Sequence, residues 1–379
     1  MARKGLTNAR HSSPNPRKNH KEEPPDEILQ AHARRERRCG TAVVLAACGG
    51  SGGSSDSSGG AAGSCPLGDP DESITTTVRI AYQKIPNGDL IVKDQKILEN
   101  CMPKATISWN VFSSGGDVIQ AYGAGSVDIG LTGSNPAVKA LSAPLDATLP
   151  PTVNTWIFDV IGKGESLVVK ADITSAEGLK GKQIAVPFSS TSHYSLLNWL
   201  EMNGLSETDV ELVNLEPEAM VAAWPDLGGV FVWDPTLSEL VKQGGVVLAS
   251  AADTAAAGKP TYDLANGVKA FVDANVPFMT MWAKAQNYAV NLINNEPAAA
   301  AASISAELGV PPADVEKMFA GYTYLNAEQQ ASPDWLGGKL AQDFSSTAEF
   351  LLTQGAIEAV NTPEAYAAGV TNQFAEAAK

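Results

Sequence analysis

The sequence has few of the residues that catalytic and metal sites need. It contains four histidines, His11, His20, His32 and His193, of which only His193 lies beyond the first fifty residues. A three-histidine metal site is therefore excluded there, and the His/Cys spacings of zinc sites are absent. Beyond residue 75 there is also no G-x-S-x-G nucleophile elbow, P-loop or S-x-x-K pair. These absences favour a binding protein over an enzyme, and no cofactor is predicted.

Basic residues are scarce after the first 47 positions. Residues 1–47 carry ten Lys and Arg against five Asp and Glu, whereas the rest of the chain carries 17 against 37. The remainder therefore has a net charge of −20, which repels the phosphate backbone of nucleic acids. It also lacks a basic stripe with interleaved aromatic residues. We predict no nucleic-acid partner.

No apolar run reaches the roughly 18–20 residues that a membrane-spanning helix needs. The nearest, residues 41–48, follows four arginines and precedes a Gly/Ser/Ala-rich stretch. Basic residues, a short apolar run and small residues before a cleavage point are typical of an export signal. The order Leu-Ala-Ala-Cys at 45–48 resembles the lipobox of bacterial lipoproteins, which implies that Cys48 is lipidated. The alternative is a buried apolar segment with a structural cysteine.

The export hypothesis divides the start of the chain into two parts. Residues 1–48 are the signal, and residues 49–75 are a flexible tether, because residues 49–64 are nearly all Gly, Ser and Ala and cannot form a core. We expect the protein to be exported and lipid-anchored to the outer face of the cell membrane, or periplasmic.

The same hypothesis leaves one pair among the four cysteines. Cys39 leaves with the signal and Cys48 is acylated, so Cys65 and Cys101 remain. In an exported protein such a pair is expected to form a disulfide. Two free thiols are the alternative.

Strand-like and helix-like segments alternate from about residue 76. The predicted strands cover residues 77–82, 106–112, 127–131, 166–170, 183–187, 210–215 and 230–233. The predicted helices between them cover residues 91–100, 113–122 and 192–203. The alternation predicts an α/β fold with mainly parallel sheets. The two runs are weak copies of each other, which predicts two lobes with a cleft at the carboxyl ends of the strands. An alanine-rich helical part follows from about residue 290.

Hydroxyl residues follow the strand that is predicted to end at Pro187. Residues 187–195 read Pro-Phe-Ser-Ser-Thr-Ser-His-Tyr-Ser and lead into a predicted helix. Unpaired N–H groups and the dipole at a helix start bind sulfonate or phosphate. An ordinary N-cap explains the same residues equally well. Residues 112–117 and 132–136 show the same strand-to-turn character in the first run.

The stretch 183–197 resembles the taurine-binding periplasmic proteins within the nitrate, sulfonate and taurine binders. Segments 80–83, 210–215, 222–224, 231–235 and 321–325 share this resemblance, which extends from about residue 78 to the end of the chain. It implies a type II periplasmic-binding-protein fold, with residues 76–165 and 264–379 in one lobe and residues 166–263 in the other. It further implies a monomer that captures taurine for the permease subunits of an ABC importer.

The resemblance also implies which residues line the cleft: Gln83, Ser113, Ser114, Ser134, Glu165, Thr191, His193, Trp233 and Asp263. Taurine is a zwitterion, so its sulfonate would take N–H groups and hydroxyls, and its ammonium would take Glu165 and Asp263. Trp233 would stack on the alkyl chain and attract the ammonium. Trp233 could instead belong to the core, and the two acids to the surface.

The sequence departs from the family after Trp224, where the turn is shorter, and after Asp263, where the expected apolar strand reads Leu-Ala-Asn-Gly-Val-Lys. Three other ligands stay open: another aliphatic sulfonate, nitrate and a pyrimidine precursor. A secreted enzyme acting on sulfonates is the remaining alternative.

Overall fold

The computed structural model describes residues 64–379. The predicted export signal, the lipidation site Cys48 and most of the tether lie outside the described residues. Within residues 64–379, no helix is both long and apolar enough to span a membrane.

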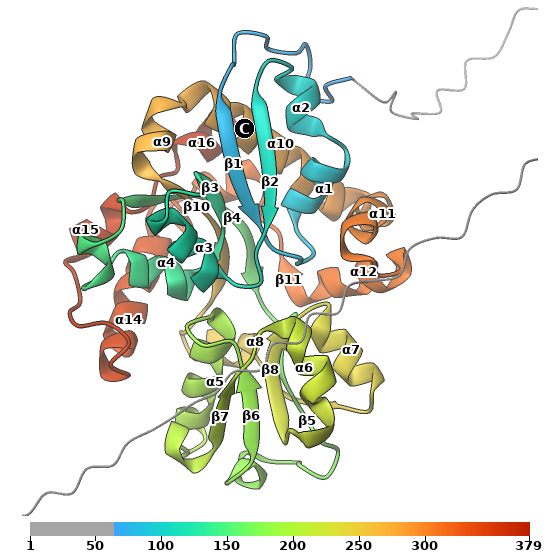
Figure 1. The fold of residues 1–379 in the computed structure, drawn as a ribbon, viewed down its shortest axis with the longest axis vertical. Helices are drawn as coiled ribbons and strands as arrows, with labels where there is room; N and C mark the ends of the chain where they lie inside the picture. The colour runs from blue at the N-terminus through green and yellow to red at the C-terminus, as the bar shows by residue number, and fades with distance from the viewer. Residues whose placement is uncertain (1–63) are drawn as a thin grey trace, which may run out of the picture. The chain divides into compact units, whose positions relative to one another are not determined.

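The first of two sheets has six strands in the order β11-β4-β10-β3-β1-β2 (Figure 1). Its strands are β1 (Thr77–Tyr82), β2 (Thr106–Val111), β3 (Ile129–Gly133), β4 (Thr152–Ile161), β10 (Tyr262–Val268) and β11 (Tyr322–Thr323). β1 pairs in parallel with β2 and β3, whereas β10 runs antiparallel to β3 and β4. The helices between its strands are α1 (Gly88–Asp94), α2 (Ile97–Cys101), α3 (Gly115–Gly123) and α4 (Ser134–Ala140). Parallel strands joined through helices confirm the predicted α/β alternation. The prediction of mainly parallel sheets is wrong, because β10 and β11 pair antiparallel here and β5 (Glu165–Val169) does so in the second sheet.

The second sheet has five strands in the order β7-β6-β8-β5-β9. These are β5 (Glu165–Val169), β6 (Gln183–Val186), β7 (Glu211–Asn214), β8 (Gly229–Trp233) and β9 (Val246–Ser250). The helices in this part are α5 (Thr191–Met202), α6 (Pro217–Ala223), α7 (Thr236–Lys242) and α8 (Ala251–Ala256). β5, β6 and β8 are almost fully buried, which explains their continuous apolar sequences.

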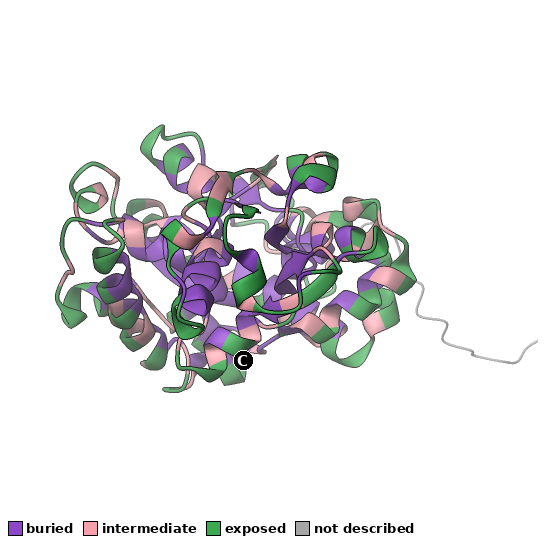
Figure 2. Cartoon of the chain, turned by 90° about the horizontal axis from the view of Figure 1, so that it is seen from below, coloured by how far each residue is buried: buried purple, intermediate pink, exposed green. Residues whose placement is uncertain are grey.

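The rest of the chain is helical apart from β11. It comprises α9 (Lys269–Ala274), α10 (Val276–Asn295), α11 (Pro297–Leu308), α12 (Pro312–Met318), α13 (Ala327–Ala331), α14 (Lys339–Thr353), α15 (Pro363–Ala368) and α16 (Gln373–Ala377). Buried residues gather in the sheets and on the helix faces that cover them (Figure 2). The two sheets and the helical C-terminal part confirm the predicted fold class.

Several elements differ from the sequence prediction, which had no segment for β9, α4, α7 or α8. Two other differences are informative. The helix predicted over residues 91–100 is two helices, because Lys96 adopts a left-handed conformation with φ of 52° between α1 and α2. β4, which the prediction omitted, is the longest strand and is buried along nearly its whole length. It is central to the site described below.

The chain passes from the first sheet to the second between β4 and β5, and it returns between β9 and β10. The backbone N–H groups of Gly162 and Gly164 both donate to the carbonyl of Gly321, at 3.0 and 2.9 Å. Glu165 therefore begins a strand of the second sheet, and Asp263 lies in a strand of the first. The sequence had placed Glu165 as the last residue before the second lobe and Asp263 as the last residue within it, so each lies on the other side of the predicted boundary by one residue. The rest of the division into lobes stays a proposal.

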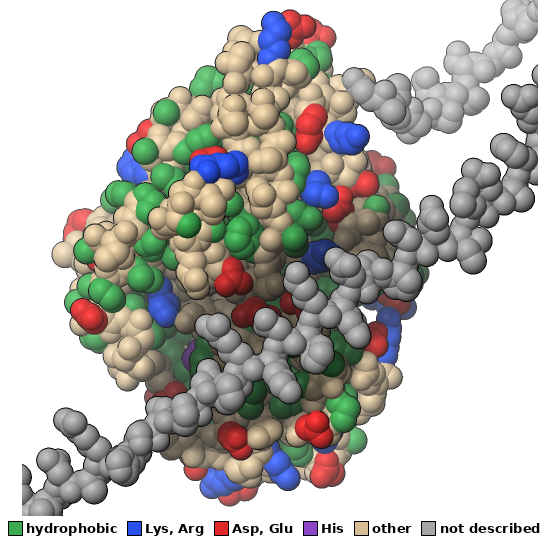
Figure 3. Space-filling model, in the orientation of Figure 1, with side chains coloured by type: hydrophobic (Ala, Val, Ile, Leu, Met, Phe, Trp, Pro, Cys, Tyr) green, Lys and Arg blue, Asp and Glu red, His purple; other side chains and the backbone are tan. Residues whose placement is uncertain are grey.

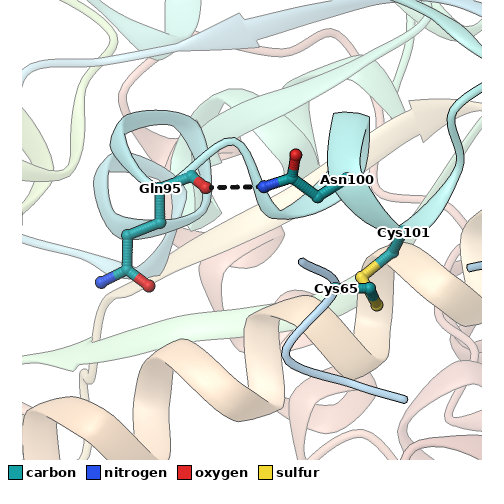
Figure 4. Close-up of a disulfide and its surroundings, with 4 residues drawn as sticks. All are labelled: Cys65, Gln95, Asn100 and Cys101. Atoms are coloured by element: carbon teal, nitrogen blue, oxygen red, sulfur yellow. Dashed lines mark hydrogen bonds between the residues drawn. A yellow bond between two sulfur atoms is a disulfide. The ribbon is translucent and has the colours of Figure 1, made fainter. Parts of the chain in front are cut away.

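A disulfide joins Cys65 to Cys101, with 4.6 Å between their Cα atoms (Figure 4). In the turn before Cys101, the Asn100 side-chain amide donates to the backbone carbonyl of Gln95 at 3.3 Å. The bridge closes a loop across 36 positions, which in the chain-entropy model stabilises the fold by about 4 kcal/mol. It attaches the start of the described chain to α2.

Candidate functional site

A cavity of about 340 Å³, including its opening, lies between the two sheets. Residues of both sheets line it: Gln83, Ile85, Gly115, Gly133, Pro136, Glu165, Ser190, Thr191, Trp233, Asp263 and Tyr322. Five of the nine predicted site residues are among them.

The strand directions explain why these residues meet. β1, β3, β6 and β8 end at the cavity, and the antiparallel strands β5 and β10 begin there. Glu165 pairs with Trp233 across β5 and β8, and Asp263 pairs with Gly133 across β10 and β3. Ligands of such sheets bind where the parallel strands end.

One side of the cavity is suited to an anion. α3 and α5 both start there, with Gly115, Ser190 and Thr191 among the lining residues. The Ser190 hydroxyl accepts from the backbone N–H of His193 at 3.2 Å and caps α5. The N–H groups of a first helical turn lack intrahelical acceptors, and the helix dipole adds partial positive charge. Two helix starts therefore offer an oxyanion neutral donors without a cationic side chain.

Gly133 and Gly115 make room for this arrangement. A Cβ atom on Gly133 would lie 2.7 Å from the Thr191 methyl carbon, and one on Gly115 would lie 2.9 Å from the backbone nitrogen of Gly133. Both distances are below normal contact. The first sheet and α5 can approach this closely only because Gly133 carries no side chain, and α3 can approach the end of β3 only because Gly115 carries none.

The cavity is also lined by two acids, one of which contacts the start of α5. These are Glu165 and Asp263, and both side chains are almost completely buried. Glu165 accepts from the Thr191 hydroxyl at 2.7 Å, and its second carboxylate oxygen is buried without a partner. Burial raises the pKa of Glu165 to about 8 and that of Asp263 to about 7. No Lys, Arg or His is among the lining residues, so a cationic ligand group would supply the missing positive charge.

Three further side chains complete the walls. Trp233, 9% exposed, offers an aromatic surface. Gln83 donates from its side-chain amide to the Leu131 carbonyl at 3.1 Å, which leaves its amide oxygen as an acceptor. Tyr322 donates from its hydroxyl to the Gly164 carbonyl at 3.0 Å and thereby ties β11 to the crossing between the sheets.

The other four predicted site residues do not line the cavity: Ser113, Ser114, Ser134 and His193. Ser114 caps α3 through Asp117. The Ser134 hydroxyl accepts from the backbone N–H of Tyr262 at 3.3 Å, so it joins α4 to β10. A hydroxyl at a helix start can face a ligand or a neighbouring strand, and sequence does not distinguish the two.

His193 lies behind the loop that precedes α5. Its ring stacks on Phe188 with 4.8 Å between centroids, and its Nδ1 accepts from the backbone N–H of Ser189 at 3.4 Å. Burial, together with the charge of Lys139, lowers the pKa of His193 to about 4. With Nδ1 accepting, the neutral ring carries its proton on Nε2, which is buried without a partner, so the predicted role of His193 as a donor stays a prediction.

Sequence reasoning missed Asp159 and Tyr322. Asp159 lies on β4, is 1% exposed and faces Asp263 in the strand register. The available signal was an acid inside the otherwise apolar run Trp-Ile-Phe-Asp-Val-Ile at 156–161. Buried acids in such runs are rare unless they are paired or bind a ligand.

Comparison with known proteins agrees with this geometry. A family model described as NMT1/THI5 like matches residues 110–226. Over 285 residues, 72% of this chain and 84% of the relative, the sequence is 36% identical to the taurine-binding periplasmic protein of Escherichia coli (strain K12). The chain belongs to the family of the taurine-binding periplasmic protein. The resemblance found in the sequence is thereby confirmed.

Solved structures support the fold of this family member. The alkanesulfonate-binding protein from Xanthomonas axonopodis pv. citri, bound to MOPS, matches with a TM-score of 0.62 and 23% identity over 80% of this chain and 99% of that chain. The periplasmic nitrate-binding protein from Synechocystis PCC 6803 matches with a TM-score of 0.65 and 16% identity over 82% and 89%. All three relatives are named as binding proteins. At these identities, the two structures establish the two-lobed fold alone.

Proposed function

We propose that this protein captures taurine outside the cytoplasm and delivers it to the permease of an ABC importer. The observation that carries the proposal is that one cavity is lined by both helix starts and buried acids. Two helix starts supply anion donors, and Glu165 and Asp263 supply uncompensated carboxylates. Taurine has a sulfonate and an ammonium two carbons apart, so one molecule would satisfy both kinds of group.

The other ligands satisfy only one kind of group. Nitrate and simple alkanesulfonates have no cationic group, so binding them would leave Glu165 and Asp263 buried beside an anion. Such a ligand gives the buried carboxyls no cationic partner to offset their desolvation, so it gains nothing from them. Trp233 adds an aromatic face that attracts an ammonium. These features favour taurine over the related ligands.

Calorimetric titration with taurine tests the proposal. We expect saturable binding of one taurine per chain, since the described residues form one cavity with both kinds of group. Taurine should be recovered unchanged afterwards, because the site is proposed to hold its ligand and not to convert it. Absence of binding, or release of sulfite or another product, would contradict the proposed function.

We further propose that the protein acts as a monomer anchored by lipid at Cys48. The Leu-Ala-Ala-Cys order and the Gly/Ser-rich stretch after it support this. We expect the membrane-extracted native protein to carry diacylglycerol on Cys48 and no residue before it. Cys48→Ser should release the protein from the membrane fraction, whereas Cys39→Ser should not. A freely soluble native protein that retains its first 47 residues would refute the anchor.

A further inference from the structure

Asp159 and Asp263 form a carboxyl pair beside the cavity. They are direct partners in the antiparallel register of β4 and β10, a position that brings two side chains on one face of a sheet into contact. Asp159 is 1% exposed and Asp263 is 6% exposed, so two carboxyls are buried at facing positions of neighbouring strands. Two carboxyls buried at facing positions resist ionising together, so the pair holds a proton at a pH where an exposed acid would be ionised.

The charged and titratable groups around this pair give it no positive partner. Glu165 adds a third carboxyl across the cavity, and the phenols of Tyr322 and Tyr324 and the carboxyl of Asp234 complete the set. Both phenols donate to backbone carbonyls, that of Tyr322 to Gly164 and that of Tyr324 to Pro86. Neither therefore neutralises the pair.

Two oxygen atoms remain unsatisfied at this place. One carboxylate oxygen of Asp159 and one of Glu165 are buried without a hydrogen-bond partner. Glu165 lines the cavity, as does Asp263. Buried carboxylate oxygens are costly unless they accept hydrogen bonds. A ligand with several N–H donors and a positive charge would supply what these acids lack.

We infer that Asp159 is a positioning residue for the ligand's ammonium, and that the ammonium replaces a proton which Asp159 shares with Asp263 in the empty cavity. The inference rests on the proposed function. On binding, the O–H bond of the protonated carboxyl breaks and its proton passes to solvent. The ammonium N–H groups then donate to the freed carboxylates. No electrons are transferred, and the total charge at the pair is conserved.

This exchange makes capture of an amine-bearing ligand depend on pH. Below neutral pH the empty cavity holds the shared proton firmly, so the ammonium must displace it. The pKa values of the acids are raised to about 7 for Asp263 and about 8 for Glu165. As pH rises through these values, the acids lose their protons to solvent, and the ammonium has fewer protons to displace. Affinity for taurine should therefore increase with pH across this window. Ethanesulfonate has no ammonium and should show little of this increase.

Calorimetry in buffers of different ionisation enthalpy counts the protons released on binding. At pH 6 the wild-type protein should release at least about one proton per taurine, and the number should fall towards zero by pH 9. Ethanesulfonate should release almost none at either pH. Asp159→Asn keeps the shape of the pair, but its amide can donate to Asp263 without a titrating proton. This variant should release about one proton fewer than wild type.

Asp89→Asn is the matched control. Asp89 is 1% exposed and burial raises its pKa to about 7, but it is bonded to Gln286 and does not line the cavity. This variant should release as many protons as the wild type. Taurine binding without proton release at pH 6, or equal release by Asp159→Asn and wild type, would overturn the inference while leaving the proposed function intact.

The ligand-free protein gives a readout that does not depend on taurine. A carboxyl whose pKa is raised on folding stabilises the fold fully below its unfolded pKa of about 4, and this stability is lost as pH rises through the folded pKa. The wild-type protein should lose stability from about pH 5 to pH 8, and Asp159→Asn should lose less. If the wild-type protein and Asp159→Asn have the same dependence of unfolding midpoint on pH, Asp159 and Asp263 share no proton, whichever ligand the protein binds.

Discussion

Replacing Glu165 by Gln and Asp263 by Asn together should weaken taurine binding by about a hundredfold to ten-thousandfold at pH 8, and should leave ethanesulfonate binding nearly unchanged. A hydrogen bond to a charged group contributes about 1.5–3 kcal/mol, and each 1.4 kcal/mol is a factor of ten in affinity. Two such bonds to the ammonium account for the expected loss. The isosteric amides keep the cavity volume, so the sulfonate end is preserved. Calorimetry with both ligands measures the change.

The control for this pair is Glu201→Gln with Asp226→Asn. Both residues are exposed and neither lines the cavity, so the change in net charge is the same without a change at the site. Taurine affinity should then stay within a factor of about two of wild type, since surface charges act weakly at this distance. Equal losses for taurine and ethanesulfonate in the cavity variant would mean that the two acids do not recognise the amine.

Gly133→Ala should weaken the binding of taurine and of ethanesulfonate to a similar extent. Its Cβ would lie 2.7 Å from the Thr191 methyl carbon, where the first sheet meets α5. Overpacking of this kind costs about 1–3 kcal/mol, which is about five- to a hundredfold or more in affinity. The loss is shared because the clash lies at the anion side, which both ligands use. Equilibrium titration of each ligand measures it.

Two further variants distinguish this clash from a general loss of folding. Adding Thr191→Ser to Gly133→Ala removes the methyl group but keeps the hydroxyl that donates to Glu165, so most of the lost affinity should return. Gly116→Ala is the control, because a Cβ there would meet only the Ser114 hydroxyl oxygen at 3.8 Å. If the double variant binds as weakly as Gly133→Ala alone, close approach at Gly133 is not what permits binding.

The sequence predicted the fold where local patterns and tertiary structure agree. The first predicted strand matches β1 residue for residue, and the helix predicted over 192–203 differs from α5 by one position at each end. β4 was missed because Asn154 and Asp159 interrupt its apolar pattern. Both are buried, and Asn154 is satisfied by contacts with Gly369 and Asn266 from remote parts of the chain. Such partners cannot be read from local sequence.

The unusual segment after Asp263 has a similar explanation. It forms β10, whose Asn266 donates from its side-chain amide to Asn154 on β4 at 3.0 Å. A polar residue replaces an apolar one there because a second polar residue faces it across the strands. The departure from the family pattern thus leaves Asp263 at the cavity.

The predicted site residues also separate into those that the strand and helix pattern locates correctly and those that depend on contacts the local sequence does not show. Glu165, Thr191, Trp233, Gln83 and Asp263 lie at strand or helix ends, where topology directs them to the cavity edge. Ser134 and His193 occupy equivalent sequence positions, but their side chains bond to neighbouring backbone. The difference depends on side-chain direction, which spacing does not determine.

The charge of the surface carries less information about function than the cavity does. On the face shown in Figure 3, Lys and Arg side chains lie singly among neutral and acidic ones where no grey atoms cover them. Exposed lysines of the described residues form short pairs with acids, such as Lys242 with Asp314 at 3.0 Å. Exposed pairs of this kind contribute little to stability. The buried, unpaired acids are the electrostatic feature that points to a ligand.

Calorimetric comparison of taurine, ethanesulfonate, nitrate and γ-aminobutyrate on the wild-type protein at pH 8 tests the central claim most directly. The four ligands separate the two kinds of group in the cavity: taurine has both an anion and an amine, ethanesulfonate lacks the amine, nitrate is an anion alone, and γ-aminobutyrate replaces sulfonate by carboxylate on a longer chain. We predict that taurine binds at least tenfold more tightly than each of the others. Ethanesulfonate or nitrate binding as tightly as taurine would contradict recognition of a zwitterion.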